Sequence, residues 1–445
     1  MYMIPFLRLV ILFMVLCFCA PMSSQDKKWQ EMHKVKRKET LFGISKKYGI
    51  TVDELVKANP EMNHPGYELK KGDYIYIPFP SPKKSPEQSK ASTVYHRPVK
   101  VGVMLPLHDV DGDGRRMVEY YRGMLMAFGK LKQEGYSIDV KAWNVNIDAD
   151  INTFLVQNGA DKCDVIFGPL YTKQVGPLAD FARKNNIKLV IPFSISGDDV
   201  DTCPNIFQIY QSPEDLNNDI IQQFSARFKN YHVVVVDCND RTSTKGVFTS
   251  ALRSSLEREG RIYNITNVNS SAEMFAKAFS NTQPNVVILN TGRSPELTAV
   301  IKKLDALKAQ IPSLAISLFG YTEWLMYAKY NQQKFFEYDT YIPTYFYYNP
   351  QINKTRAFQT EYKKWFNSDM MDYIPRFALT GYDHGMYFIK GISKDGANFN
   401  GSQENTEALQ TRMHFVRSGI AGGYRNKSFM FVHYNPNRTI STINF

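Results

Sequence analysis

The sequence has few cysteines and none of the compact motifs that mark common enzyme sites. Only five cysteines occur in 445 residues, and no pair has the CxxC spacing of a redox or zinc site. No G-x-S-x-G, H-E-x-x-H or P-loop pattern is present. Asp383 and His384 are adjacent, and neighbours on a helix point apart and do not form a catalytic dyad. These absences predict a protein without catalytic activity, metal site or cofactor.

Beyond the first 24 residues, no stretch is both apolar enough and long enough to cross a membrane. The apolar run at residues 9–20 is too short to span a bilayer and is typical of a signal peptide. We therefore expect residues 1–24 to be cleaved on export and the mature chain to be periplasmic or associated with the cell envelope. Cys17 and Cys19 each follow a large apolar residue, whereas lipoprotein processing favours a small one, so a cleaved signal peptide is favoured over a lipid anchor.

Three cysteines follow that segment: Cys163, Cys203 and Cys238. In an oxidising compartment they allow one disulfide at most, and the sequence leaves their pairing open. At least one of them is expected to be a free thiol.

The chain has a net charge of +11, and much of the basic excess lies in residues 25–97. A basic patch first suggests nucleic acid. An exported protein rarely meets nucleic acid, however, and meets anionic wall polymers and membrane surfaces instead. The charge therefore predicts a partner in the cell envelope and no nucleic acid.

Residues 80–98 are rich in Pro, Ser and Lys and contain almost no apolar residues. This composition is typical of a solvated linker. It divides the mature chain into a small domain at residues 31–79 and a large domain at residues 99–440.

The large domain alternates short strand patterns with helical ones. Strand patterns occur at residues 100–107, 164–169, 188–194, 232–238, 284–292 and 313–320. The segments between them are long enough for helices, as parallel βαβ units require. The predicted fold class is therefore α/β, with two doubly wound lobes in which ligands would bind beyond the carboxyl ends of the strands.

The sequence of the small domain predicts two short helices between two short strands, in the order β-α-α-β. Thr40 precedes the apolar residues Leu41 and Ile44, and Thr51 precedes Leu55, so that an N-cap residue stands before each amphipathic helix. We expect Ile44 and Leu55 to lie in the core of this domain.

Three motifs make the small domain similar to the LysM domain over residues 33–78: "TLFGISKKYGI", "TVDELVKANP" and "LKKGDYIYIP". The resemblance implies binding of N-acetylglucosamine-containing glycans such as peptidoglycan in a shallow groove. One side of that groove would be formed by Glu39, Thr40, Leu41 and Phe42. The other side would be formed by Asn59, Pro60, Glu61 and Met62.

One pair of residues departs from the LysM pattern. The family usually has Gly-Asp before Thr-Leu, whereas this chain has Lys38 and Glu39. A lysine restricts the backbone at a point where a glycine would allow an unusual conformation, and the glutamate keeps the negative charge on a longer side chain.

The large domain resembles the type I periplasmic binding proteins, the group that contains the branched-chain amino-acid binding proteins. The resemblance rests on "VIFGPLYTKQVGPLADFARKNNIKLVIPFSIS", "GYDHGMYFIKGI" and "GIAGGYRNKSFMFVHY". It implies two α/β lobes joined by three crossovers, closing on a ligand by a hinge. The first lobe would contribute Tyr171, Thr172, Ser194, Ile195 and Ser196 to the solute-binding cleft. The second lobe would contribute Thr291, Gly292, Arg293 and Tyr321.

Two acidic features near these strand ends have alternative interpretations. Glu323 is a candidate to hold the ammonium group of an amino acid, although the nearby Arg293 has the opposite charge. Asp111 and Asp113 fit the first half of an EF-hand loop, but Glu119 lies one position too early for its last ligand. A solvated acidic turn is therefore expected there rather than a calcium site.

Together these features predict an exported, non-catalytic protein that a LysM module anchors to peptidoglycan. Two functions remain open for the large domain. In the first, it captures a small amino-acid-like or peptide-like solute. In the second, it binds a cell-envelope protein as a scaffold or regulator of cell-wall synthesis and holds no solute. A wall hydrolase is disfavoured because no hydrolase motif is present.

Overall fold

The computed structural model describes residues 29–63, 67–80, 98–156, 159–193, 197–403 and 407–445. The predicted signal peptide, most of the predicted linker, and Ser194, Ile195 and Ser196 lie outside the described residues. The chain forms two compact units. The first unit is Met1–Thr93 together with Thr360–Asp369, and the second is Val94–Gln359 together with Met370–Phe445.

The N-terminal part of the first unit has the predicted β-α-α-β order. Its elements are β1 (Glu31–Lys34), α2 (Leu41–Tyr48), α3 (Val52–Ala58), a 3-10 turn η1 (Pro60–Asn63) and β2 (Tyr74–Ile77). The two strands pair in antiparallel fashion, with Glu31 opposite Ile77. The Thr51 side chain accepts from the Glu54 amide while Glu54 accepts from the Thr51 amide, so that a capping box starts α3.

The core of this small module lies between its helices and its sheet. Its innermost side chains are Leu41, Ile44, Leu55, Val56, Met62, Ile75 and Ile77. Ile44 and Leu55 are therefore core residues, as expected. The outer face of the sheet is instead aromatic, because the alternating residues Tyr74 and Tyr76 are exposed and Trp29 stacks on Tyr76 at 5.0 Å.

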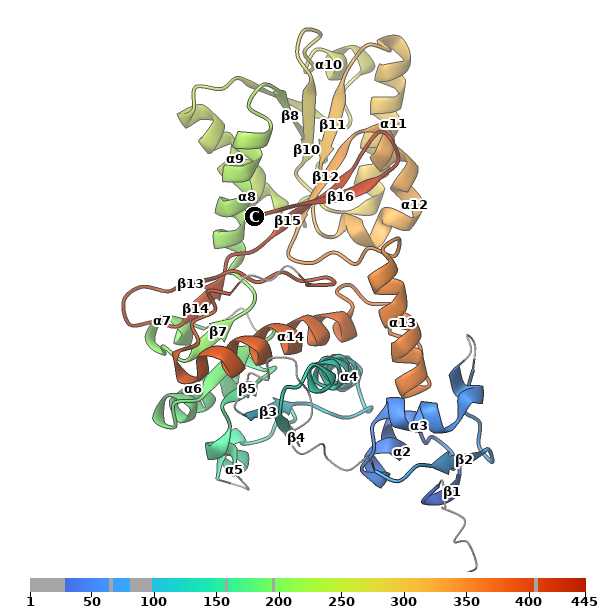
Figure 1. Cartoon of the computed structure of the whole chain (residues 1–445). Coiled ribbons are helices and arrows are strands. Elements are labelled where there is room, and N and C mark those ends of the chain that lie inside the picture. The colour runs from blue at the N-terminus through green and yellow to red at the C-terminus, as the bar shows by residue number, and fades with distance from the viewer. Residues whose placement is uncertain (1–28, 64–66, 81–97, 157–158, 194–196, 404–406) are drawn as a thin grey trace, which may run out of the picture. The chain divides into compact units, whose positions relative to one another are not determined.

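The second unit contains two seven-stranded sheets, each flanked by helices (Figure 1). The first lobe contains β3 (Val99–Leu105), α4 (Gly112–Gln133), β4 (Ile138–Asn144), α5 (Ile151–Leu155), η2 (Ala160–Lys162), β5 (Val165–Phe167), η3 (Thr172–Gln174), α6 (Val175–Lys184), β6 (Lys188–Ile191), α7 (Asp199–Thr202), β7 (Ile206–Gln208), α14 (Phe377–Asp395), η4 (Gly396–Asn398), β13 (Phe415–Arg417) and β14 (Tyr424–Asn426). Its strand order is β13-β14-β7-β6-β5-β3-β4.

The second lobe repeats this pattern with strand order β16-β15-β12-β11-β10-β8-β9. Its elements are α8 (Pro213–Arg227), β8 (His232–Asp237), α9 (Lys245–Arg258), β9 (Tyr263–Asn267), α10 (Ala272–Ala276), β10 (Asn285–Leu289), α11 (Ser294–Gln310), β11 (Ile316–Phe319), α12 (Trp324–Glu337), β12 (Thr340–Thr344), β15 (Met430–Tyr434) and β16 (Ile440–Asn444). The strands β9, β8, β10, β11 and β12 run parallel. The predicted bilobed, doubly wound α/β architecture is confirmed.

The chain passes between the two lobes at three places. The crossovers follow β7, follow β12, and join β14 to β15. The helix α13 (Asn353–Phe366) begins after the second crossover. The tyrosine-rich run at 338–350 thus contains β12 and the start of a crossover, as its mixture of β-formers and turn residues suggests.

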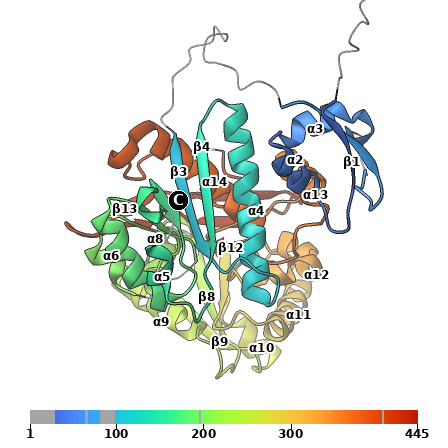
Figure 2. The same ribbon diagram turned by 90° about the horizontal axis from the view of Figure 1, so that it is seen from below.

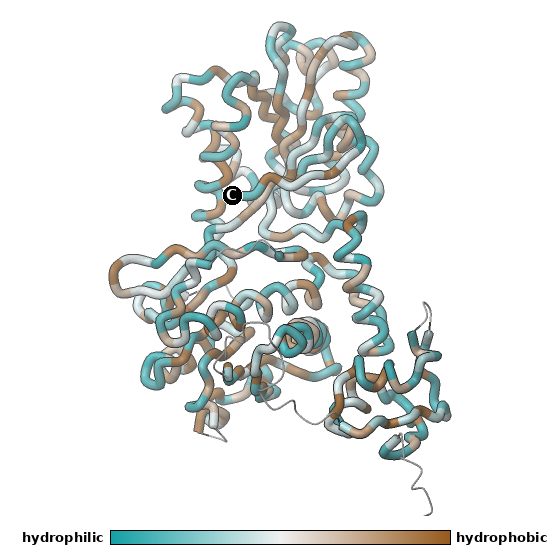
Figure 3. The backbone as a smooth tube through the Cα atoms, in the orientation of Figure 1, coloured by the Kyte–Doolittle hydropathy of each residue, from teal (hydrophilic) through white to brown (hydrophobic). Residues whose placement is uncertain are grey.

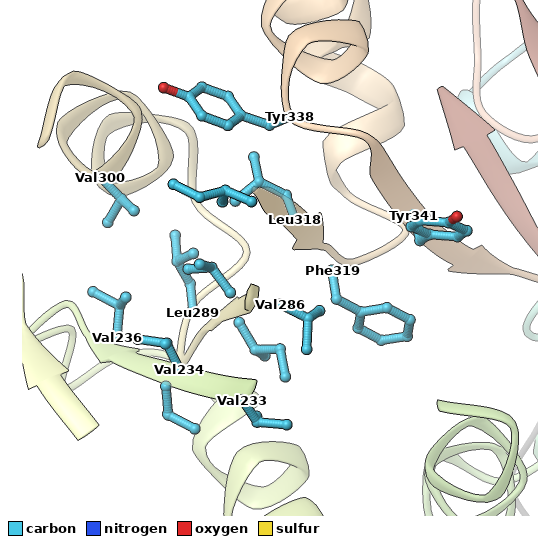
Figure 4. Packing of buried hydrophobic residues seen from close by; sticks show 14 of the residues in the cluster. Val233, Val234, Val236, Val286, Leu289, Val300, Leu318, Phe319, Tyr338 and Tyr341 are labelled. Carbon is cyan, nitrogen blue, oxygen red and sulfur yellow. The ribbon is translucent and has the colours of Figure 1, made fainter. Parts of the chain in front are cut away.

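Both faces of the second-lobe sheet are buried, because helices cover each side. Leu318 and Phe319 are adjacent on β11 and point to opposite faces, Leu318 toward Val300 of α11 and Phe319 toward the other layer (Figure 4). The central strands β8, β10 and β11 are consequently mostly apolar, whereas the edge strands β9 and β16 are partly exposed and contain polar residues. The helices alternate between polar and apolar residues (Figure 3).

In the first lobe, α4 and α14 pack against each other closely, and α4 lies beside β3 and β4 (Figure 2). Glycine makes this approach possible: a Cβ atom at Gly123 would lie 1.8 Å from the Ala378 carbonyl oxygen, and one at Gly381 would lie 1.9 Å from the Tyr120 carbonyl oxygen. The motif "GYDHG" is therefore part of a helix crossing. No helix among the described residues is long and apolar enough to span a bilayer.

Candidate binding sites

The first side of the predicted groove begins in the turn between β1 and α2. Lys38 has φ +65°, the left-handed conformation that a glycine adopts without strain. The Glu39 carboxylate closes the turn, because its Oε2 accepts from the Lys36 amide at 2.7 Å and contacts His33 Nε2 at 2.8 Å. Burial opposes ionisation, but these two hydrogen bonds prevail and hold the pKa of Glu39 below its ordinary value. Lys38 and Glu39 thus build the turn that Gly-Asp would build.

The next three residues start α2. The Thr40 hydroxyl caps the helix by accepting from the Gly43 amide at 3.0 Å. Leu41 is buried in the core of the module, whereas Phe42 is half-buried. Phe42 stacks on Trp365 with ring centroids 5.7 Å apart, and its ring lies 5.6 Å from that of Phe366.

The second side of the predicted groove contains both structural and exposed residues. Asn59 is fully buried, and its Nδ2 donates to the Leu55 and Tyr76 carbonyls at 2.7 and 2.8 Å. Its Oδ1 accepts from the Tyr76 amide at 2.7 Å, so that this side chain ties η1 to β2. Met62 is also buried, while Pro60 and Glu61 are exposed.

A pocket of about 310 Å³ lies on the α3 side of this groove. Its lining residues are Asp53, Val56, Lys57, Pro60, Asn63 and Lys364. Only Pro60 belongs to the residues that the LysM resemblance predicted. The other lining residues were not predicted from the sequence. The pattern that could have indicated some of them is the polar face of the amphipathic helix α3, which carries Asp53 and Lys57.

In the first lobe of the second unit, the predicted Tyr171 lies near the start of α4. Its hydroxyl donates to Asp113 Oδ2 at 3.2 Å. Burial, with the negative charge of Asp113, raises the pKa of Tyr171 to about 12. Thr172 is the first residue of η3. These two residues lie in the segment that follows β5.

Asp111 is the N-cap residue of α4, and Asp113 and Glu119 lie within the helix rather than in an acidic turn, each with its carboxylate engaged by neighbouring groups. Asp111 caps the helix by accepting from the Gly114 amide at 2.7 Å, and Asp113 forms an ion pair with Arg116. Glu119 is buried and accepts from the Met371 amide. In the part of the chain that the structure describes, no group of three or more His, Cys, Asp or Glu residues is placed to hold a metal ion.

In the second lobe, Thr291 and Arg293 share contacts with a residue that the sequence did not single out. Thr291 is buried and donates to Asp240 Oδ2 at 2.8 Å, and it accepts from the Arg293 amide at 3.2 Å. The Arg293 guanidinium lies 3.7 Å from Asp240. Hydrogen bonds from Thr242 and Thr291 hold the pKa of Asp240 below its ordinary value. The charge of Arg293 is thus balanced within the chain.

The other two predicted residues of this lobe lie beside an ion pair between Lys245 and Glu323. Lys245 Nζ lies 2.7 Å from Glu323 Oε1 and 5.0 Å from the centre of the Tyr321 ring. Tyr321 is buried and donates to the Leu289 carbonyl. A Cβ atom at Gly292 would be 3.5 Å from both Lys245 and Glu323, so this glycine lies directly beside the pair. Glu323 Oε2 is buried and accepts no hydrogen bond from the described residues.

A larger pocket, of about 510 Å³, lies beside the second crossover and the start of α12. This volume is within the range of small-molecule sites. Its lining includes Met326, Lys329, Tyr347, Tyr348, Tyr373 and Arg376, and none of the six predicted cleft residues that the structure describes. The tyrosine-rich run at 338–350 could have signalled this pocket, since it supplies the rings of Phe346, Tyr347 and Tyr348 to the lining.

Cys163, Cys203 and Cys238 are buried free thiols, and no disulfide joins them. Burial raises the pKa of Cys163 to about 11 and that of Cys238 to about 12. A thiol with a raised pKa is a weak nucleophile, so these cysteines behave as small core residues.

Two family models match the chain. The model described as "Periplasmic binding protein" matches residues 98–429, and the LysM domain model matches residues 33–78. No curated protein matches the chain.

Many solved structures share the fold. LpoA of Haemophilus influenzae is 13% identical with a TM-score of 0.51, over 79% of this chain and 59% of that chain. A branched chain amino acid ABC transporter periplasmic ligand-binding protein from Burkholderia xenovorans LB400 is 12% identical with a TM-score of 0.48, over 78% and 94% of the two chains. LivJ of Streptococcus pneumoniae, in complex with isoleucine, is 15% identical with a TM-score of 0.40, over 78% and 100%.

Proposed function

Because the chain belongs to the periplasmic binding protein family and also carries a LysM domain, we propose that it is an exported, non-catalytic binding protein held on peptidoglycan by its N-terminal module. The observation that carries this proposal is the presence of both domains in one chain. The LysM module would fix the protein to the wall, and the bilobed unit would bind a second partner there.

Anchoring is supported by the exposed groups of the predicted groove. Pro60 and Glu61 are exposed at η1, and among the described residues no donor contacts Glu39 Oε1. Apolar side chains suit the faces of sugar rings, and carboxylate oxygens can accept hydrogen bonds from sugar hydroxyls and acetamide groups.

Anchoring is tested by sedimenting the mature full-length chain with purified insoluble peptidoglycan. We expect the protein to pellet, and to be released by soluble N-acetylglucosamine hexamer. Because the chain is basic, the assay is repeated at 0.5 M salt, where screening weakens binding that is only electrostatic. Loss of all binding at high salt, or failure of the hexamer to compete, would contradict a glycan site.

For the bilobed unit, capture of a small amino-acid-like or peptide-like solute is the first candidate. Glu323 Oε2 is a buried acceptor without a donor among the described residues, beside Tyr321 and Gly292. A buried acceptor left unpaired is costly, and a solute with an N–H or O–H group would satisfy it. A thermal-shift screen of the full chain with amino acids, short peptides and muropeptides tests this candidate, with a rise in melting temperature as the expected result.

A scaffold that binds a cell-envelope protein is the second candidate, and the Lys245–Glu323 pair favours it. The chain's own ammonium group already faces this carboxylate at 2.7 Å. The charge that would hold an amino-acid ligand is therefore neutralised. Absence of any thermal shift, together with capture of a wall-synthesis protein by the full chain and not by a control binding protein, would favour this second function.

A further inference from the structure

The predicted groove is contacted by a segment that lies about 300 residues further along the chain. Residues Thr360–Asp369 belong to the same compact unit as the LysM module. They comprise the end of α13 and the three residues after it. Asn367, with φ +49°, is in the left-handed conformation that commonly ends a helix, and it follows the last helical residue, Phe366.

On one side of the groove, two rings of this segment cover Phe42. Trp365 stacks on Phe42 with an interplanar angle of 15°. The Phe366 ring contacts the Phe42 ring at an interplanar angle of 53°. Trp365 and Phe366 are only 7% and 5% exposed. They are therefore buried against the module and offer no open platform on which a sugar could stack.

On the other side, polar contacts fix the same segment. Asn367 Nδ2 donates to the Leu69 carbonyl at 3.2 Å, and Lys363 lies 3.7 Å from the Glu68 carboxylate. Lys364 lines the 310 Å³ pocket together with Pro60 and Asn63. One segment thus reaches both sides that the LysM resemblance assigns to glycan, namely Phe42 and Pro60.

We propose that residues 360–369 are an internal occupant of the LysM groove and compete with the wall glycan for Phe42. This inference rests on the proposed function, because it concerns the same groove. A sugar ring that stacks on the face of Phe42 covered by Trp365 must displace Trp365, since one face of a ring stacks on one partner at a time. Glycan binding and docking of the segment then oppose each other, and by linkage each weakens the other by the same factor.

The test compares the full chain with its Trp365→Ala variant in the peptidoglycan sedimentation assay. We expect the variant to bind roughly tenfold more tightly, the effect of losing one aromatic stacking contact from the competing state. Tyr330→Ala is the matched control, because Tyr330 is an aromatic residue on α12 that is 84% exposed, and its removal should leave binding unchanged.

A second measurement follows the segment itself by hydrogen exchange of the full chain. Adding N-acetylglucosamine hexamer should speed exchange at the amides of residues 360–367, and Phe42→Ala should do the same without any sugar. Equal binding by wild type and Trp365→Ala overturns the inference and leaves anchoring intact. Weaker binding by the variant also overturns it, because the segment would then be part of the glycan site. If neither protein binds peptidoglycan, the proposed anchoring fails and the competition fails with it.

Discussion

Lys245 and Glu323 form an ion pair of 2.7 Å at the carboxyl ends of the second-lobe strands, with the Tyr321 ring beside the lysine. Both side chains are partly exposed, at 28% and 39%, so the pair adds little to stability, about 1 kcal/mol or less. We propose that its larger effect is on recognition, because the lysine would compete with the ammonium group of an amino-acid ligand for Glu323.

Replacing this lysine should therefore change ligand preference more than stability. In Lys245→Met, Glu323 has no cationic partner, and we expect millimolar leucine or glycine to raise the melting temperature of the variant more than that of the wild type. Lys277→Met is the control, since Lys277 forms a comparable 2.8 Å pair with Glu273 on the exposed helix α10. A wild-type shift as large as that of Lys245→Met would show that the lysine does not block the site.

Lys38→Gly should stabilise the LysM module. A lysine at φ +65° costs about 1 kcal/mol that a glycine does not, although part of the gain is lost to the greater freedom of glycine in the unfolded chain. We expect the free energy of unfolding of the module to rise by about 0.5 kcal/mol, measured from hydrogen exchange of its slowest amides. The neighbouring Lys36→Gly is the control and should lower stability, because Lys36 is not among the residues with positive φ.

Much of the architecture follows from local sequence patterns. The apolar runs that became β3, β8, β10 and β11 are short, rich in valine, isoleucine and leucine, and separated by helix-length segments, a combination that few folds other than a parallel sheet accommodate. Thr40 and Thr51 likewise marked the starts of both helices of the small module.

The contacts at the sites were harder to predict. Asn59 occupies a loop position that suggested a sugar ligand, yet its amide is used by backbone groups of Leu55 and Tyr76. The approach of Trp365 to Phe42 has no local signal, because these residues are more than 300 positions apart. Periodicity describes one element at a time, whereas such contacts depend on how distant segments pack.

Asn59→Ala should destabilise the LysM module strongly. The substitution removes three hydrogen bonds and leaves the Tyr76 amide and the Leu55 and Tyr76 carbonyls without this partner. The expected loss in the module's free energy of unfolding is about 3 kcal/mol. Asn63→Ala, at the exposed end of η1, is the control and should change it by less than about 0.5 kcal/mol. If Asn59→Ala weakened peptidoglycan binding while protection of the module's amides stayed unchanged, the residue would act on the glycan directly.

Gly381→Ala should prevent normal packing of the first lobe. The new methyl group would lie 1.9 Å from the Tyr120 carbonyl oxygen, a backbone atom that cannot move without separating α4 from α14. We expect a loss of more than about 4 kcal/mol, seen as aggregation or a lowered urea midpoint. In Gly246→Ala, in α9, the added Cβ atom has no neighbouring atom within 4 Å. This substitution should instead stabilise its helix by up to about 1 kcal/mol. Similar behaviour of the two variants would contradict the close helix crossing.

Asp383 should make the second unit less stable as the pH rises from about 4 to 7. Its carboxyl is buried on α14, and burial raises its pKa to about 7 despite hydrogen bonds from the amides of Leu409, Gln410 and Thr411. Below pH 3.8 the group is protonated in both the folded and the unfolded chain. Between pH 3.8 and 7 only the unfolded chain releases the proton, so stability falls across this window and levels off above it, by on the order of 2–4 kcal/mol.

The measurement is the difference in urea-unfolding free energy between wild type and Asp383→Asn at pH 4.5 and 7.5. Burial also lowers the pKa of the neighbouring His384 to about 3, and this makes the folded protein less stable as the pH falls. Because His384 is present in both proteins, its contribution cancels in the difference between them. We expect the variant to lack the decrease due to Asp383, so that its stability relative to wild type improves at the higher pH. Asp395→Asn, at the last residue of α14, should show the same pH dependence as wild type. An identical pH dependence in wild type and Asp383→Asn would mean that Asp383 is ionised in the folded protein throughout this range, held in that state by its three backbone donors.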